Sequence, residues 1–163
     1  MKTAIIYTSK HGTTAKVVQM IAERLTGNQV SIIDLKKEKC PDVNSFDGII
    51  LGTSIYASAS SKTMQRFCKE NIEALKQKRL ALFVCGMEPD SAKQQQELAN
   101  AYPQELYEYA VSKCFAGGEF LFEKMNFFER TVIKRIAKTD RSVSAIKSDE
   151  IDKLIMEIIN AGS

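Results

Sequence analysis

The chain has 163 residues, of which 44% are hydrophobic and 26% are charged, and its net charge is +3. This composition is that of a globular domain and excludes a disordered chain, and so mild a charge gives no argument for a nucleic-acid partner. A domain of this size buries about 70% of its unfolded surface, enough to fold without disulfides or a structural metal. We therefore expect a single domain over residues 1–163.

The first half of the chain alternates short apolar runs with helical patterns. An apolar run over residues 3–7 predicts a buried strand; it is too short for a signal peptide or a membrane span, which indicates a cytoplasmic protein. Apolar side chains at helical spacing follow over residues 17–25 and end at Gly27. Strands are predicted at 30–35 and 47–52, and a helix over 64–75.

The second half continues the alternation. A fourth strand is predicted at 80–85, helix over 91–112 with an interruption at Pro103, a fifth strand at 114–122, and helices at 126–138 and 149–161. Strands that are continuous apolar runs are covered on both faces. The predicted fold is therefore α/β, a doubly wound five-stranded parallel sheet in a three-layer α/β/α sandwich. Ligands of such sheets bind beyond the carboxyl ends of the strands.

Cysteine and histidine patterns do not predict a metal site. Cys40, Cys68, Cys85 and Cys114 include no CxxC pair, and three of them lie in apolar stretches, which is typical of buried free thiols. A redox pair or a metal site is the alternative. His11 is the single histidine of the chain.

The loop after the first strand is rich in hydroxyl groups. It reads Thr8-Ser9-Lys10-His11-Gly12-Thr13-Thr14 and leads into a helix. A helix N-terminus offers unpaired N–H groups and the positive end of the helix dipole, so the added hydroxyls predict a phosphate cradle. The alternative is that Thr13 or Thr14 merely caps the helix, but capping uses one hydroxyl rather than four.

Several other classes of phosphate-binding or phosphate-handling loop do not match. The chain has neither GxxxxGK[ST] nor GxGxxG, which excludes the nucleotide triphosphate loop and the dinucleotide loop. The acidic residues of a receiver domain are absent, as are the cysteine and arginine of a low-molecular-weight phosphatase.

The loop resembles the FMN phosphate loop of flavodoxins, roughly [ST]-x-T-G-x-T, with one extra residue. With this extra residue, the spacing of the loop is similar to that in the flavodoxin-like menaquinone-dependent protoporphyrinogen dehydrogenases. The likeness runs along nearly the whole chain and includes the segments 47–55, 115–118, 126–130 and 134–136. It implies a flavodoxin-like fold, FMN as cofactor, and electron transfer with a redox partner protein, a quinone or a small-molecule substrate.

In the resembled family, the loops after the third and fourth strands hold the flavin ring. The residues that the resemblance implies there are Thr53, Ser54, Ile55, Tyr56, Ala57, Gly86 and Met87. Tyr56 is the single aromatic residue of these loops, and its alternative is an ordinary surface tyrosine. Electron-carrier flavodoxins usually place a second aromatic residue at the ring; here Met87 stands in its place and the chain has no tryptophan.

The late segment combines aromatic and basic residues. Phe128, Val132 and Ile136 share one helical face, and Arg130, Lys134 and Lys138 the opposite one. The Phe128–Lys138 helix is therefore a candidate for peripheral contact with an anionic membrane or an acidic partner. The alternative is a stripe packed on the sheet with solvated cations. Residues 88–109, five acidic and one lysine, do not match the long basic loop of the resembled dehydrogenases.

Three functions compete at this stage. The basic charge favours an FMN-dependent oxidoreductase over a plain flavodoxin electron carrier, because carriers are commonly acidic. A binding module that has lost FMN is the third, and the intact hydroxyl loop argues against it. No catalytic acid or base can be assigned; His11 and Tyr56 are the nearest candidates for moving a proton, since the flavin carries the chemistry.

Overall fold

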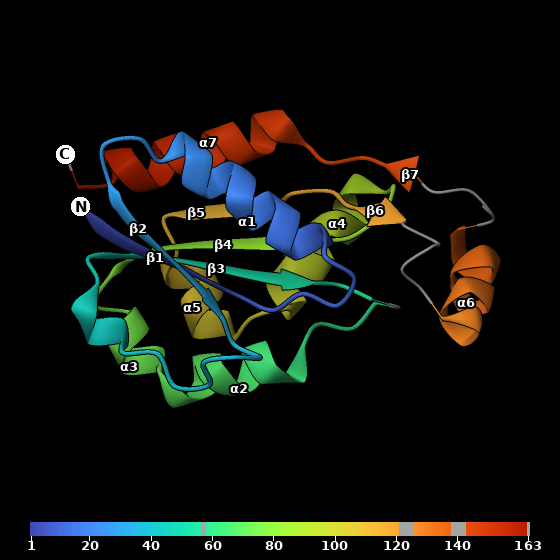
Figure 1. The fold of residues 1–163 in the computed structure, drawn as a ribbon, viewed down its shortest axis with the longest axis horizontal. Helices are drawn as coiled ribbons and strands as arrows, with labels where there is room; N and C mark the ends of the chain where they lie inside the picture. Colours follow the sequence, from blue (N-terminus) through green and yellow to red (C-terminus); the bar gives the residue numbers. More distant parts are fainter. Residues whose placement is uncertain (57, 121–125, 138–142, 163) are drawn as a thin grey trace.

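The computed structural model describes residues 1–56, 58–120, 126–137 and 143–162. Its main sheet has five parallel strands in the order β2-β1-β3-β4-β5 (Figure 1). They are β1 (Lys2–Tyr7), β2 (Gln29–Asp34), β3 (Gly48–Ser54), β4 (Arg79–Cys85) and β5 (Ser112–Phe115). The strand order reverses beside β1, which places a topological switch point between β1 and β3. The predicted parallel α/β fold is confirmed.

Helices cover both faces of the sheet, and Figure 1 shows the two layers. One layer contains α1 (Thr13–Arg24) and α7 (Ser148–Asn160). The other contains α2 (Lys62–Glu70), α3 (Ile72–Leu75), α4 (Ser91–Asn100) and α5 (Gln104–Tyr109), with a short 3-10 turn, η1 (Val43–Ser45). The core is correspondingly split in two: Ile5 and Ile50 face α1 and α7, whereas Ile6 and Leu51 face the other layer.

Two predicted elements differ in detail from the structure, and a third has the interruption that was predicted for it. The predicted fifth strand ends early: β5 stops at Phe115, the chain turns at Gly117 with φ +75°, and β6 (Glu119–Phe120) pairs antiparallel with β7 (Val143–Ser144). A continuous strand is impossible there because Gly117 lies in the left-handed region. Pro103 interrupts the predicted long helix, as expected. The helix over 64–75 is also divided, at Asn71, whose side chain donates to the Phe67 carbonyl.

The helix α6 (Phe127–Ala137) stands apart from both layers, beyond the carboxyl ends of the strands (Figure 1). Phe127 is 86% exposed and Phe128 74% exposed, so the first residue of the predicted apolar stripe does not pack on the sheet. Lys138, the end of the predicted contact helix, lies outside the described residues. No helix in the described part of the chain is long and apolar enough to cross a membrane.

The four thiols are free, as the sequence predicts. Cys68, Cys85 and Cys114 are buried, and burial raises the pKa of each thiol to about 12. They are therefore neutral at physiological pH and behave as small apolar core residues.

Candidate functional site

Strand register brings two of the predicted loops together at one edge of the sheet. Tyr7, the last residue of β1, pairs with Gly52 of β3. The Thr8 N–H then donates to the Gly52 carbonyl at 3.0 Å, and the buried Thr8 and Thr53 hydroxyls are hydrogen-bonded at 2.9 Å. The loops after β1 and β3 are thus joined at the switch point, where ligands of such sheets bind.

The N-terminus of α1 is open toward this edge. Gly12 is its N-cap, with φ 93°, and no side chain caps the helix. The predicted alternative, in which Thr13 or Thr14 serves as cap, is therefore not the arrangement in the structure. The first-turn N–H groups lack intrahelical acceptors, and the first turn holds no acidic residue. This end of the helix suits an anion.

Hydroxyl groups surround that helix end. Ser9 Oγ accepts a hydrogen bond from the Gly12 N–H at 3.1 Å and keeps its own proton for another acceptor. Thr13 and Thr14 are buried. The Thr14 hydroxyl has no nitrogen or oxygen partner among the described residues, and the group that interacts with it is the weakly hydrogen-bonding Cys85 thiol. A buried hydroxyl without a good partner is one that a bound acceptor could satisfy.

A cavity of about 300 Å³ adjoins the loop. Five residues that the sequence predicts for the site line it: Thr8, Ser9, Lys10, Ser54 and Tyr56. The structure adds Lys36, Ser60 and Ser61, which sequence reasoning missed. A signal for them existed in the lysine pair after β2 and in the run of serines before α2. The lining contains two lysines and no carboxylate, so the cavity favours an anionic group.

Tyr56 is in contact with two residues of the loop after β1. Lys10 Nζ lies over its ring, 3.6 Å from the centroid, and the His11 ring approaches at 5.7 Å in an edge contact. The backbone of Tyr56 closes a tight turn with Ala59 by two hydrogen bonds, and Ser58 has φ 63° within it. Ala57, also predicted for the site, lies outside the described residues.

The environment of Tyr56 also perturbs its titration. Burial raises the pKa of the Tyr56 hydroxyl above its ordinary value, and the negative charge of Glu129 adds to the rise. The hydroxyl is therefore a proton donor rather than a phenolate at physiological pH. No hydrogen-bond partner for its oxygen is found among the described residues.

A carboxylate from α6 reaches the loop. Glu129 Oε2 lies 2.7 Å from His11 Nε2, and both side chains are less than one-fifth exposed. A second contact joins Lys16 of α1 to Glu119 of β6, also at 2.7 Å. The late segment is thus fastened to the start of α1 at two points. The sequence gives no local sign that Glu129 contacts His11.

The loop after β4 lies at the same edge but does not line the cavity. The Gly86 N–H donates to the Gly117 carbonyl at 2.9 Å, and the Ile55 N–H donates to the Cys85 carbonyl at 2.7 Å. Gly86 is buried and Met87 is half-buried. A side chain at Gly118 would meet the backbone of Gly86, so the turn after β5 braces this loop.

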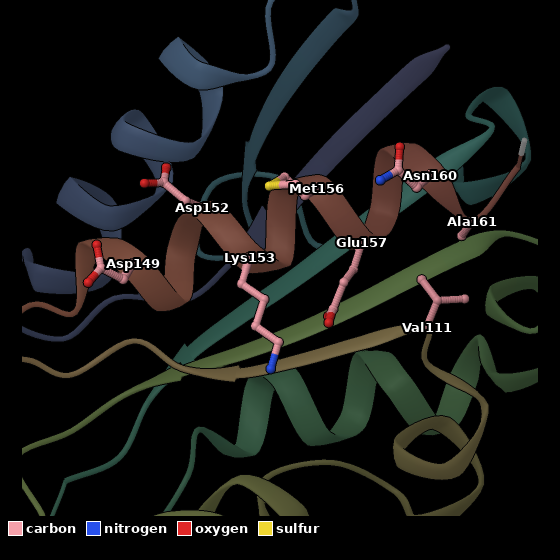
Figure 2. A pocket seen from close by; sticks show the side chains of 8 residues that line it. All are labelled: Val111, Asp149, Asp152, Lys153, Met156, Glu157, Asn160 and Ala161. Atoms are coloured by element: carbon pink, nitrogen blue, oxygen red, sulfur yellow. The ribbon is translucent and has the colours of Figure 1, made fainter.

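A larger hollow of about 760 Å³ runs along α7 and Val111 (Figure 2). Its rim carries the carboxylates Asp149, Asp152 and Glu157, and the sequence predicts none of its residues for a site. The smaller cavity is the functional candidate because it lies at the switch point, beside an uncapped helix N-terminus, and is lined by cations and hydroxyls.

Comparison with known proteins gives one family. The model of the Flavodoxin domain matches residues 4–145. Among curated proteins, the chain is 20% identical over 144 residues to protoporphyrinogen IX dehydrogenase [quinone] of Escherichia coli K12, covering 85% of this chain and 80% of that protein.

Solved structures give the same result for the fold. A short-chain flavodoxin associated with a non-canonical PDU bacterial microcompartment has a TM-score of 0.65 and 11% identity, over 100% of this chain and 99% of that one. Oxidised Flavodoxin 1 of Bacillus cereus has a TM-score of 0.54 and 19% identity, over 98% and 97%.

Proposed function

The chain belongs to the flavodoxin domain family and is a flavodoxin-like FMN protein; from this premise we propose that it is an oxidoreductase whose FMN is held at the cavity beside α1. The observation that carries the placement is the uncapped N-terminus of α1, where Gly12 leaves the N–H groups free and hydroxyls gather around them. Thr14, buried without a good partner, supports it.

The residues at this edge fit FMN. Ser9, Thr13 and Thr14 and the first-turn N–H groups of α1 would hold its phosphate. Of these residues Ser9 lines the cavity, together with Ser54. Tyr56 would contact the flavin ring. When bound, FMN supplies one- and two-electron chemistry. The protein orients the group and limits water, and the protonated Tyr56 hydroxyl is able to donate a hydrogen bond at the site.

A spectrum tests this proposal. We expect the purified protein to bind added FMN in a one-to-one complex whose visible flavin bands bleach on adding dithionite. The measurement is a titration followed by absorbance and by the quenching of flavin fluorescence. A folded protein that leaves FMN fluorescence unchanged at all concentrations would remove the proposed function and leave the fold unaffected.

Substrate turnover distinguishes the enzyme from its alternative. The E. coli relative is named as a quinone-linked dehydrogenase of protoporphyrinogen IX, and the net charge of +3 departs from the acidic character of electron carriers. The second candidate is an electron carrier, favoured by the whole-length likeness to flavodoxins. An enzyme reduces a quinone at the expense of a porphyrinogen, whereas a carrier passes electrons to a protein partner only.

The helix α6 is the surface by which this protein would meet an anionic membrane. Phe127 and Phe128 are exposed at its start, and Lys134 and Arg135 are exposed further along. Exposed aromatic side chains enter the headgroup region of a bilayer while cations bind anionic lipids. Because α6 contacts the phosphate loop through Glu129, this membrane contact would bring a lipid-soluble quinone close to the cofactor.

The change Lys134→Gln with Arg135→Gln should weaken binding to vesicles of phosphatidylserine and phosphatidylcholine about thirtyfold at low salt, since each cation near such a surface contributes about 1 kcal/mol. Co-sedimentation measures it. The matched control, Lys69→Gln with Lys153→Gln, removes two exposed lysines elsewhere and should bind nearly as the parent does. Equal losses for the two pairs would mean that α6 is not the contact surface.

A further inference from the structure

The two lysines that line the cavity have different partners. Lys10 Nζ lies over the ring of Tyr56, 3.6 Å from its centroid. Lys36 Nζ donates to the backbone carbonyl of Ser9, in the phosphate loop itself. Both come to the cavity from exposed positions, one after β1 and the other after β2.

We propose that these lysines have different roles toward the flavin. Lys10 is a positioning residue that orients Tyr56 at the flavin ring, and Lys36 interacts with the phosphate group. This inference rests on the proposed function, because it assigns roles toward the same FMN.

The contacts of Tyr56 explain why Lys10 would decide the ring position. Its hydroxyl has no hydrogen-bond partner among the described residues, so the ring is not oriented through its oxygen. The loop that carries it is a short turn closed on Ala59. What orients the ring is therefore the Lys10 ammonium over its face and the T-shaped contact with the His11 ring. A cation over the face of a tyrosine is attracted by the ring and so favours one position of that ring.

The contacts of Lys36 indicate a role at the phosphate end of FMN. The turn after β2 is ordered by the Asp34 carboxylate, which accepts from the Lys36 N–H at 2.9 Å. From this turn, the Lys36 ammonium binds the Ser9 carbonyl, so it holds the residue whose hydroxyl faces the helix N-terminus. Its charge lies beside the loop rather than over an aromatic ring, which suits a phosphate.

Comparing FMN with riboflavin separates the two roles, because riboflavin has the same ring and lacks the phosphate. We expect Lys10→Met to weaken both ligands by the same factor, about threefold. Lys36→Met should weaken FMN about fivefold and riboflavin by less than twofold. Fluorescence titration measures the dissociation constants. A loss in Lys10→Met confined to FMN would overturn the assignment of Lys10, and an equal loss of both ligands in Lys36→Met that of Lys36.

Two further variants show whether Lys10 acts through the tyrosine. In a Tyr56→Leu background, Lys10→Met should change neither dissociation constant, and Lys10→Arg in the parent should keep both near their original values, since arginine also stacks on aromatic rings. A full threefold loss in the Tyr56→Leu background would overturn the inference. If the parent binds neither flavin, the proposed function itself fails and takes this inference with it.

The contact is also testable without flavin. Urea unfolding of the parent, Lys10→Met, Tyr56→Leu and the double variant should show coupling, with the double variant losing less stability than the sum of the single losses. Strict additivity would contradict the Lys10–Tyr56 contact, whatever the flavin titrations give.

Discussion

Replacing Gly12 with aspartate is expected to weaken FMN binding about a thousandfold or more. Gly12 has φ 93° at the N-terminus of α1, a conformation in which a side chain is strained. The new carboxylate would lie beside the helix end that is proposed to hold the phosphate. Two like charges about 4 Å apart near a protein surface repel by about 4 kcal/mol, which accounts for most of the loss.

Gly12→Asn is the matched control for this change. It introduces the same backbone strain and nearly the same shape without the charge, and asparagine tolerates the left-handed region well. We expect it to lose about tenfold in FMN affinity. Both variants should fold, because one strained left-handed residue costs about 1–3 kcal/mol, less than the usual free energy of unfolding of a domain. Isothermal titration at pH 7 and circular dichroism provide the comparison; aspartate and asparagine variants of equal affinity would mean that no phosphate lies at this helix end.

Gly52→Ala should cost about 2–3 kcal/mol of folding free energy. Gly52 is at the switch point, where the fully buried ring of Phe83 packs directly on it. A Cβ at this position would lie 2.1 Å from Phe83 Cζ and 2.3 Å from Cε1, far inside contact distance. Because the ring has no open space to enter, the added methyl must displace core side chains or the strand itself.

Replacing the Phe83 ring with a smaller side chain tests that explanation. Phe83→Leu alone should destabilise the protein by creating space, and Gly52→Ala with Phe83→Leu should be clearly more stable than the sum of the two losses predicts. The measurement is urea unfolding followed by circular dichroism. Additive losses would show that the glycine is required for another reason. Thr8 donates to the Gly52 carbonyl, so the double variant also reports whether the phosphate loop keeps its place, through FMN affinity.

Local sequence patterns were enough for most of the sheet. β3 and β4 are almost entirely buried because helices cover both faces, and this is why they read as continuous apolar runs rather than alternating ones. The end of β5 was mispredicted because a turn and a long-range strand pairing, rather than local burial, decide where the strand stops. Residues 114–118 are apolar or small, but Gly117 turns the chain, and the pairing of β6 with β7 joins segments far apart in the sequence.

The residues of the candidate site likewise fall into two groups, those that the sequence predicted and those that only the tertiary structure brings there. The hydroxyl loop was predicted because residue type, a single glycine and a following helix are local signals, whereas Tyr56 was implied by the resemblance to a known family. Lys36 enters the cavity through the pairing of β1 with β2, and Glu129 reaches His11 from more than a hundred residues away. The position of Lys10 over the Tyr56 ring likewise depends on two loops that only the β1–β3 register brings together.

The sequence by itself therefore determined the fold class, the family and a candidate binding loop, because burial, helix capping and turn chemistry act between near neighbours in the chain. The tertiary structure alone decided which charges share the cavity, where α6 stands and what each lysine contacts. Those contacts depend on strand order and register, and a single sequence encodes them only through the energy of the whole fold.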